Sequence, residues 1–358
     1  MVPFAGYSMP VQYPLGVLKE HLHTRAAAGL FDVSHMGQVM VTPVSGWMDD
    51  AALALEKLVP VDVLALKPGR QRYALFTNDA GGILDDLMIA NLGDGFIVVV
   101  NAGCKVADIA HMRAHLSNDC VVTELTDQAL LALQGPMAES VLIRLGAAIS
   151  DMKFMDVRRT KIGMVDVIIS RSGYSGEDGF EISVPANQAV ALARKFLADA
   201  SVRPIGLGAR DSLRLEAGLC LYGHDLDEAT NPVEASLDWA IQKSRRLGGA
   251  RAGAFPGAEV ILHQLDHGST IHRVGLLPEG RAPIREGTQL FATHDAPTAV
   301  GEVTSGGFGP SLNAPLAMGY VPGGMAEIGS RLFADVRGKR LAVRVVAMPF
   351  VKLGYKRN

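Results

Sequence analysis

The stretch from residue 72 to residue 101 constrains the fold more than any other part of the chain. The pattern over 72–101 changes to one with period two, and strands are expected at 73–76, 83–91 and 96–101. Asparagine, aspartate and glycine fill the two turns between these strands. A helical pattern follows over 105–116. These elements predict a compact α+β block.

Helices and strands alternate on both sides of this block. Further helices are expected at 17–29 (ended by Gly29), 47–58, 137–145, 186–200 and 209–217. Further strands are expected at 37–41, 129–134, 165–171 and 180–184. A chain of 358 residues, at about 150 residues per domain, predicts two to three domains.

The pattern changes again at residue 272, where short strands and Gly/Pro turns replace the helices. Strands are expected at 274–277, 301–305, 317–321, 331–336 and 341–347. The 39 glycines of the chain favour many tight turns and hence much β-structure. We therefore expect a separate C-terminal β-barrel or sandwich, joined by a basic, Gly/Ala-rich connector at 245–257.

Composition narrows the function classes. The formal net charge of -3 disfavours a duplex-nucleic-acid binder, and no apolar run approaches the ~20 residues of a membrane span. The start of the chain has no basic and apolar pattern of an export signal. Three cysteines without CxxC spacing do not predict a disulfide framework or a thiolate zinc site. His111 and His115 could share a helix face, but with no third ligand we expect no metal.

Three polar residues stand out from their local patterns. Asp108 lies in the first turns of the 105–116 helix, where it is either a solvated carboxylate near a helix N-terminus or a carboxylate presented at a strand-to-helix junction. Glu181 shares one strand face with Ser183, which is either a solvent face or a binding face. Arg210 opens the 209–217 helix, where a helix-end salt bridge is the simpler interpretation. The GxxGxxG series at Gly173 is interpreted as a hairpin turn, since it opens no long helix.

Ten motifs, taken together and in order, resemble those of the aminomethyltransferase (T protein) family of the glycine cleavage system. The resemblance covers nearly the whole chain. The motifs are MVPFAGY (1–7), FDVSHMG (31–37), GILDDL (82–87), LQGP (133–136), GYSGEDGFE (173–181), ARDSLRLEAGL (209–219), NPVE (231–234), FPG (255–257), TSG (304–306) and MGYVP (318–322). Family members usually have a short segment before the VPFAG motif, within which this chain begins.

The resemblance implies a three-domain, clover-like folate-binding fold of the α+β class, with folate in a central hole. The first domain is discontinuous and comprises 1–44 plus 150–255. The second is the α+β block at 45–149, which carries Asp108, and the third is the C-terminal β-barrel at 270–358. A bacterial chain of this family is expected in the cytoplasm, and a processed eukaryotic chain in the mitochondrial matrix.

The family reaction passes the methylene of an aminomethyl group, held on the lipoyl arm of the partner H protein, to tetrahydrofolate. Ammonia and the dihydrolipoyl arm are released. The folate nitrogens are the nucleophiles, so neither a protein nucleophile nor a metal is needed. By resemblance, Asp108 is the catalytic carboxylate beside the folate amine, and Glu181 accepts the pterin N–H groups. Arg210 matches a family arginine that contacts the glutamyl tail of folate, and Tyr355 matches a C-terminal tyrosine near the ligand. Tyr73 and Arg285 are weaker candidates for lining the folate cavity.

Two alternatives share the expected fold. One is a folate-binding relative that assists iron–sulfur cluster assembly, whose Lys-Gly-Cys-Tyr-type motif is missing around Cys220. Another is the folate domain of sarcosine or dimethylglycine dehydrogenases, which carry a flavin domain whose Gly-rich loop is not found here. A non-enzymatic binding module is the alternative from another class. Folate titration and a turnover assay separate these possibilities.

Overall fold

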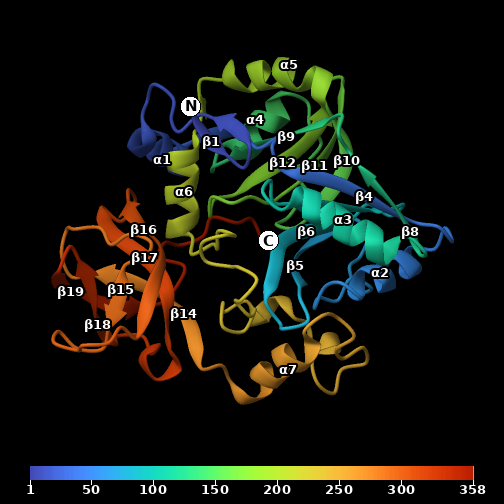
Figure 1. The fold of residues 1–358 in the computed structure, drawn as a ribbon. Helices are drawn as coiled ribbons and strands as arrows, with labels where there is room; N and C mark the ends of the chain where they lie inside the picture. Colours follow the sequence, from blue (N-terminus) through green and yellow to red (C-terminus); the bar gives the residue numbers. More distant parts are fainter. Residues whose placement is uncertain (358) are drawn as a thin grey trace.

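The computed structural model describes residues 1–357 and builds them on three sheet-based units (Figure 1). These are a five-stranded sheet, a six-stranded sheet and a closed six-stranded barrel, and a short hairpin precedes them. The barrel forms its own lobe at the lower left of the view, and the C-terminus lies near the centre, between the units. The α+β multidomain class with a C-terminal β-barrel is confirmed, and the sandwich alternative is wrong. Within residues 1–357, no helix is long and apolar enough to cross a membrane.

The five-stranded sheet is antiparallel in the order β5-β6-β7-β4-β8. Its helix-covered face includes Leu87 and Ile89, which belong to one apolar core with residues of two helices. Because side chains alternate along a strand, Asp85 lies on the same face as Leu87, whereas Asp86 lies on the opposite face with Met88. The elements are β4 (Gly37–Pro43), β5 (Arg70–Thr77), β6 (Ile83–Asn91), β7 (Phe96–Val100), β8 (Cys120–Glu124), α2 (Met48–Glu56) and α3 (Lys105–Leu116).

The six-stranded sheet has the order β10-β11-β12-β9-β3-β13. Buried side chains of α4 and α5 share one apolar core with this sheet, and those of α6 share another with β3 and β9. The elements are β3 (Ala28–Asp32), β9 (Gln128–Gln134), β10 (Val157–Ile162), β11 (Val165–Ser170), β12 (Gly179–Pro185), β13 (Val202–Pro204), α1 (Val17–Ala26), α4 (Ala138–Arg144), α5 (Ala186–Leu197) and α6 (Leu207–Glu216).

Gly29 does not end the first helix as expected, because α1 stops at Ala26 and Gly29 lies inside β3. A Cβ at this position would approach Thr24 Oγ1 to 2.5 Å and Ile205 to 2.6 Å. Glycine is therefore needed where the strand passes closely beneath its neighbours, rather than for a helix cap.

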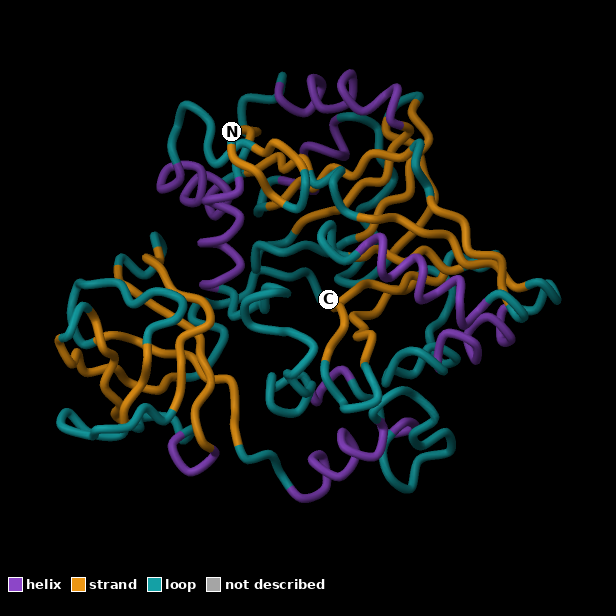
Figure 2. The backbone as a smooth tube through the Cα atoms, viewed as in Figure 1, coloured by secondary structure: helices purple, strands orange, loops and turns teal. Residues whose placement is uncertain are grey.

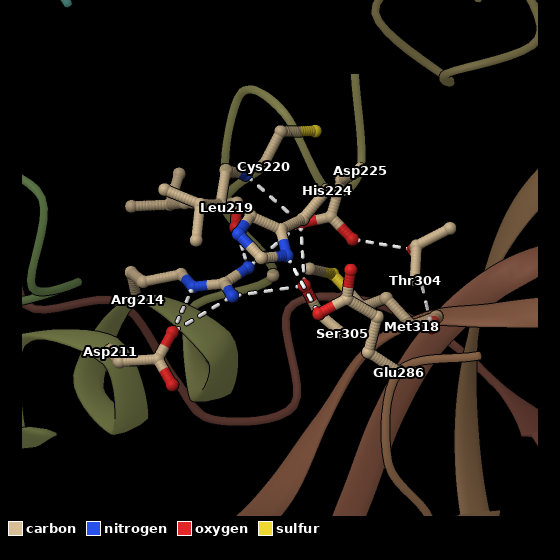
Figure 3. Close-up of polar contacts among 12 residues, drawn as sticks. Asp211, Arg214, Leu219, Cys220, His224, Asp225, Glu286, Thr304, Ser305 and Met318 are labelled. Atoms are coloured by element: carbon tan, nitrogen blue, oxygen red, sulfur yellow. Dashed lines mark hydrogen bonds and ion pairs between the residues drawn. The ribbon is translucent and has the colours of Figure 1, made fainter. Parts of the chain in front are cut away.

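The barrel closes in the order β14-β17-β16-β15-β18-β19 around an apolar interior. It is tied to α6 by Arg214, whose guanidinium donates to Ser305 Oγ at 2.9 Å and pairs with Asp225 at 2.8 Å (Figure 3). The strands are β14 (Ile271–Pro278), β15 (Gln289–Phe291), β16 (Gly301–Gly309), β17 (Ala314–Pro322), β18 (Arg331–Val336) and β19 (Lys339–Val346).

The chain between α6 and the barrel runs mostly as loop before the helix α7 (Ala258–His267), a helix not among those expected from the sequence (Figure 2). The expected connector at 245–257 is anchored rather than loose. Arg245 is buried and pairs with Glu56 at 3.2 Å, and Arg251 pairs with the same carboxylate at 2.8 Å. The connector is thus held against the five-stranded unit.

Two strands belong to a different unit from the one expected from the sequence. β4 lies before residue 45 but pairs with β7 and β8 in the five-stranded sheet. β9 lies before residue 150 but pairs with β3 and β12 in the six-stranded sheet. The chain therefore passes between the two units twice, once before β4 and once before β9.

Candidate functional site

Asp108 is buried at the junction between β7 and α3. The helix begins at Lys105, and the backbone N–H of Asp108 donates to Cys104 O at 2.9 Å. The side chain is 3% exposed, and its Oδ2 atom has no hydrogen-bond partner among residues 1–357. The interpretation as a solvated carboxylate is therefore wrong. An unpaired buried carboxyl oxygen is a group that a ligand can satisfy.

Two further carboxylates, both on β6, lie beside Asp108, and Asn101 donates hydrogen bonds to both of them. Asn101 donates to Asp85 through its backbone N–H at 3.0 Å and its Nδ2 at 2.9 Å. The same Nδ2 donates to Asp86 Oδ1 at 2.8 Å. Tyr73 donates its hydroxyl to the other oxygen of Asp86 at 3.1 Å. Asp85, Asp86 and Asp108 form what we call the acid cluster.

Burial dominates the electrostatics of the acid cluster. It raises the pKa of Asp108 to about 9, and the neighbouring charge of Asp85 and a hydrogen bond with Asp85 act in the same direction. Burial also raises the pKa of Asp85 and, together with the charge of Asp85, raises that of Asp86 to about 7. Like charges this close cannot all ionise in a low-dielectric site, so the cluster holds protons at neutral pH.

Glu181 lies on the face of β12 that is turned toward the five-stranded sheet. Its carboxylate accepts a hydrogen bond from Ser172 Oγ at 3.1 Å. Burial raises its pKa, although Arg210 and Ser172 act to lower it. Its strand neighbour Ser183, two residues along, is 4% exposed. The solvent-face interpretation of this strand is wrong.

A cavity between the two sheets reaches Glu181. Three buried polar atoms along it have no partner in the described part of the chain: Gln38 Oε1, Gln71 Nε2 and Ser183 Oγ. Its other walls are largely apolar and come from both sheets. Unsatisfied polar atoms that share one cavity indicate a place for water or for a polar ligand edge. No sequence pattern marks these glutamines, because only the packing of the two sheets brings them together.

Arg210 lies in the first turn of α6, with its guanidinium 4.8 Å from the centre of the Tyr174 ring. The helix-end salt bridge forms elsewhere, because Asp211 pairs with Arg214 at 2.8 Å. No ion pair to Arg210 is found within residues 1–357. Burial lowers its pKa, and the charge of Glu181 opposes this effect. Arg210 and Glu181 therefore lie near one another, with the guanidinium available to an anionic group.

Tyr174 contacts Arg210 and is also affected by the charge of Asp86. Burial raises the pKa of Tyr174, and the charges that act on it include those of Arg210 and Asp86. Its hydroxyl donates to the backbone carbonyl of Cys220. Tyr73, which contacts Asp86, stacks on Trp239 with ring centres 5.4 Å apart. Arg210 of the Glu181–Arg210 pair and Asp86 of the acid cluster thus both act on Tyr174.

The loop between β11 and β12 carries the glycine series and receives the C-terminal tail. A Cβ on Gly173 would lie 1.9 Å from Gln134 Oε1, so this glycine permits close packing in a hairpin turn. The tail binds the loop through the Gly354 N–H, which donates to Gly176 O at 2.8 Å. Tyr355 then stacks on Phe154 with ring centres 4.0 Å apart, and burial raises its pKa to about 12.

Arg285 is placed differently from the other expected residues. It lies in the exposed loop between β14 and β15, and its backbone N–H donates to Thr288 Oγ1 at 3.2 Å. The structure shows no contact between its side chain and the acid cluster, Glu181 or Arg210. In the part of the chain that the structure describes, no three or more His, Cys, Asp or Glu side chains are arranged so that they could hold a metal ion.

Comparisons with known proteins match both parts of the chain. A family model described as the GCVT N-terminal domain matches residues 1–245, and one described as the glycine cleavage T-protein C-terminal barrel domain matches residues 272–352. The chain is 46% identical to a mitochondrial aminomethyltransferase of Dictyostelium discoideum, with 100% of this chain and 90% of that protein covered. It is also 46% identical to the human mitochondrial aminomethyltransferase, with 99% and 87% covered.

Among solved structures, the glycine cleavage system aminomethyltransferase T from Bartonella henselae matches with a TM-score of 0.92. The sequence identity is 46%, and the match covers 99% of this chain and 95% of that chain. The fold, and the order of its units, are therefore shared over nearly the full length.

Proposed function

Because this chain belongs to the glycine cleavage T-protein family of aminomethyltransferases, we propose that the acid cluster and the Glu181–Arg210 pair form its transfer site. The family activity moves a methylene group from the aminomethyl-loaded lipoyl arm of H protein to tetrahydrofolate. The products are 5,10-methylenetetrahydrofolate, ammonia and dihydrolipoyl H protein. The single observation that carries the assignment is the buried, unpaired Oδ2 atom of Asp108.

The residues present fit a reduced folate. Asp108 offers a buried oxygen to an amine N–H, and a buried carboxylate stabilises positive charge that develops beside it. Glu181 offers two acceptor oxygens to the adjacent N–H donors of a pterin edge. Arg210 has no carboxylate partner and suits a carboxylate of the glutamyl tail. When bound, tetrahydrofolate supplies the nucleophilic amines, so the chain itself orients the substrates and moves protons.

Three further assignments are carried over from the family. We place Tyr355 beside the ligand because the tail that carries it reaches the loop before Glu181. Tyr73 lines the same region through Asp86. Arg285 would serve as a binding residue only if a ligand extended toward the barrel loop, since its side chain lies in that exposed segment.

The lipoylated H protein is the proposed partner. We keep the proposed division into three domains, except that β4 and β9 belong to the neighbouring units by their sheet pairing. The related enzymes of Dictyostelium and human carry the name mitochondrial. For this chain we propose the cytoplasm if its source is bacterial and the mitochondrial matrix if it is a processed eukaryotic protein.

The direct test uses aminomethyl-loaded H protein and measures ammonia release with and without tetrahydrofolate. An aminomethyltransferase releases ammonia rapidly only when tetrahydrofolate is present, and it forms one methylene-folate per ammonia. A non-catalytic folate-binding relative would bind folate in a titration and release no ammonia above the background rate. That second outcome would overturn the proposal.

A further inference from the structure

We infer that Asp85 is a positioning residue that shares one proton with Asp108, so that the pair donates one proton and accepts one within a single turnover. The inference rests on the proposed role of Asp108. Asp85 itself lies on the helix-covered face of β6 and is fully buried. It therefore acts through Asp108 rather than on the substrate.

The geometry around Asp85 favours its anionic form. Its two oxygens each accept a hydrogen bond from Asn101, one from the backbone N–H and one from the side-chain amide. An oxygen that accepts a hydrogen bond is a poor place for a proton, so the proton of the pair resides on Asp108. Asp108 hydrogen bonds to Asp85 through its carboxyl group, and no other side chain within residues 1–357 satisfies its buried Oδ2 atom. The carboxyl group of Asp108 is where a substrate group would exchange the proton.

Among residues 1–357, no cation is one of the groups that act most strongly on this pair. The titratable groups that act on Asp85 or Asp108 are Asp86 on β6 and Cys104 just before α3, and Tyr222 in the loop after α6 responds to both carboxylates. Tyr73 on β5 reaches the cluster through Asp86. All of these groups are acidic or neutral. A second negative charge on the pair is therefore costly until positive charge develops on the transferred methylene.

The chemistry requires a group that both donates and accepts. Two N–H bonds of tetrahydrofolate break while two N–C bonds to the methylene form. The C–S and C–N bonds of the aminomethyl group break, and the sulfur and the amine nitrogen each gain one proton. The two protons lost by the folate amines thus equal the two gained by the leaving groups. A pair that starts with one proton can give it to a leaving group and recover one from a folate amine.

The test compares Asp85→Asn with wild type in the pH profile of kcat. Without the neighbouring charge, Asp108 ionises at lower pH, so we expect the profile to move toward acid by at least about one pH unit and kcat near neutral pH to fall about tenfold or more. The Kd for tetrahydrofolate should stay within about threefold. The matched control is Asp79→Asn, an exposed aspartate in the turn before the same strand, which should move neither quantity.

A loss of kcat with an unshifted pH profile would show that Asp85 is only structural and would overturn the inference. If Asp85→Asn does not fold, difference infrared spectroscopy of the wild type at pH 7 decides instead. A protonated buried carboxyl band that disappears in Asp108→Asn supports the shared proton, and its absence in the wild type overturns it. If Asp108→Asn keeps full turnover, the role proposed for Asp108 fails; if only Asp85→Asn behaves like wild type, this inference alone fails.

Discussion

Arg214 of α6 and Asp225 of the following loop form a buried ion pair of 2.8 Å, and both side chains hydrogen bond to Ser305 of the barrel (Figure 3). Asp225 also accepts a hydrogen bond from Thr304 at 2.6 Å. One turn before Arg214, the same helix carries Arg210. The contact that docks the barrel therefore also fixes the helix that presents the proposed folate-binding arginine.

Asp225→Asn should lower the free energy of unfolding by about 3 kcal/mol or more, because it leaves the buried Arg214 without its buried charge partner. Asp211→Asn is a matched control, since Asp211 pairs with the same arginine but its side chain is 58% exposed. Exposed pairs contribute about 0–1 kcal/mol, so this variant should stay near wild type. Urea denaturation measures both. Equal losses in the two variants would contradict a special role for the buried pair.

Asp108→Asn should lower turnover by at least about 10²-fold while folate still binds, since the amide keeps the shape of the side chain but cannot exchange the proton. Single-turnover ammonia release gives the rate, and folate titration gives the binding. Asp119→Asn, a partly exposed carboxylate just after the same helix, should retain the wild-type rate. Wild-type turnover in Asp108→Asn would show that the catalytic carboxylate is misassigned.

Local sequence patterns predicted several elements with the same end residues that the structure shows: β6, α3 and β18. The strand β10 was not predicted, because Arg158, Arg159 and Lys161 give it the composition of a solvated loop. It nevertheless pairs along its whole length with β11. Helix α7 was not predicted, because a Pro-Gly turn directly precedes it. Pairing partners and tertiary contacts, which a single sequence does not reveal, decide such segments.

Part of the candidate site could likewise be predicted from the sequence, and part depends on tertiary packing. The position of Asp108 at a strand-to-helix junction was readable from periodicity, and its match to the family identified it as a candidate. The proximity of Asp85 and Asp108 was not readable, because it depends on β6 and β7 pairing so that Asn101 reaches both β6 aspartates. The unpaired atoms of Gln38 and Gln71 likewise depend on how two sheets face one another.

Glu181→Gln should weaken tetrahydrofolate binding by about 10- to 100-fold, since hydrogen bonds to a charged group contribute about 1.5–3 kcal/mol. At saturating folate, kcat should change little. Isothermal titration measures the affinity, with Glu124→Gln on the edge strand β8 as a control of the same chemistry. Unchanged affinity in Glu181→Gln would remove this residue from the pterin site.

Replacement of all three cysteines by serine should leave catalysis largely intact. Burial raises the pKa of Cys120 to about 11 and that of Cys220 to about 12, and it raises the pKa of Cys104 still further, so none is a thiolate at neutral pH. A serine at position 104 also keeps a hydrogen-bond donor beside Asp85. Loss of turnover in a triple variant whose circular dichroism is native would argue for a protein nucleophile.

Asp108→Asn should also stabilise the fold increasingly as the pH rises. In the folded chain the pKa of Asp108 lies at about 9, above its ordinary value of 3.8, so the native state holds a proton that the unfolded state releases. Wild-type stability contributed by this group is complete below pH 3.8 and is lost as the pH rises toward about 9. The asparagine donates to Asp85 as the protonated acid does, but it cannot ionise. The free energy of unfolding of the variant relative to wild type should therefore be higher at pH 8 than at pH 5 by more than about 1 kcal/mol.

Urea denaturation at both pH values checks this, with Asp119→Asn expected to show no such trend. A difference that is constant or falls with pH would mean that Asp108 is ionised in the resting protein.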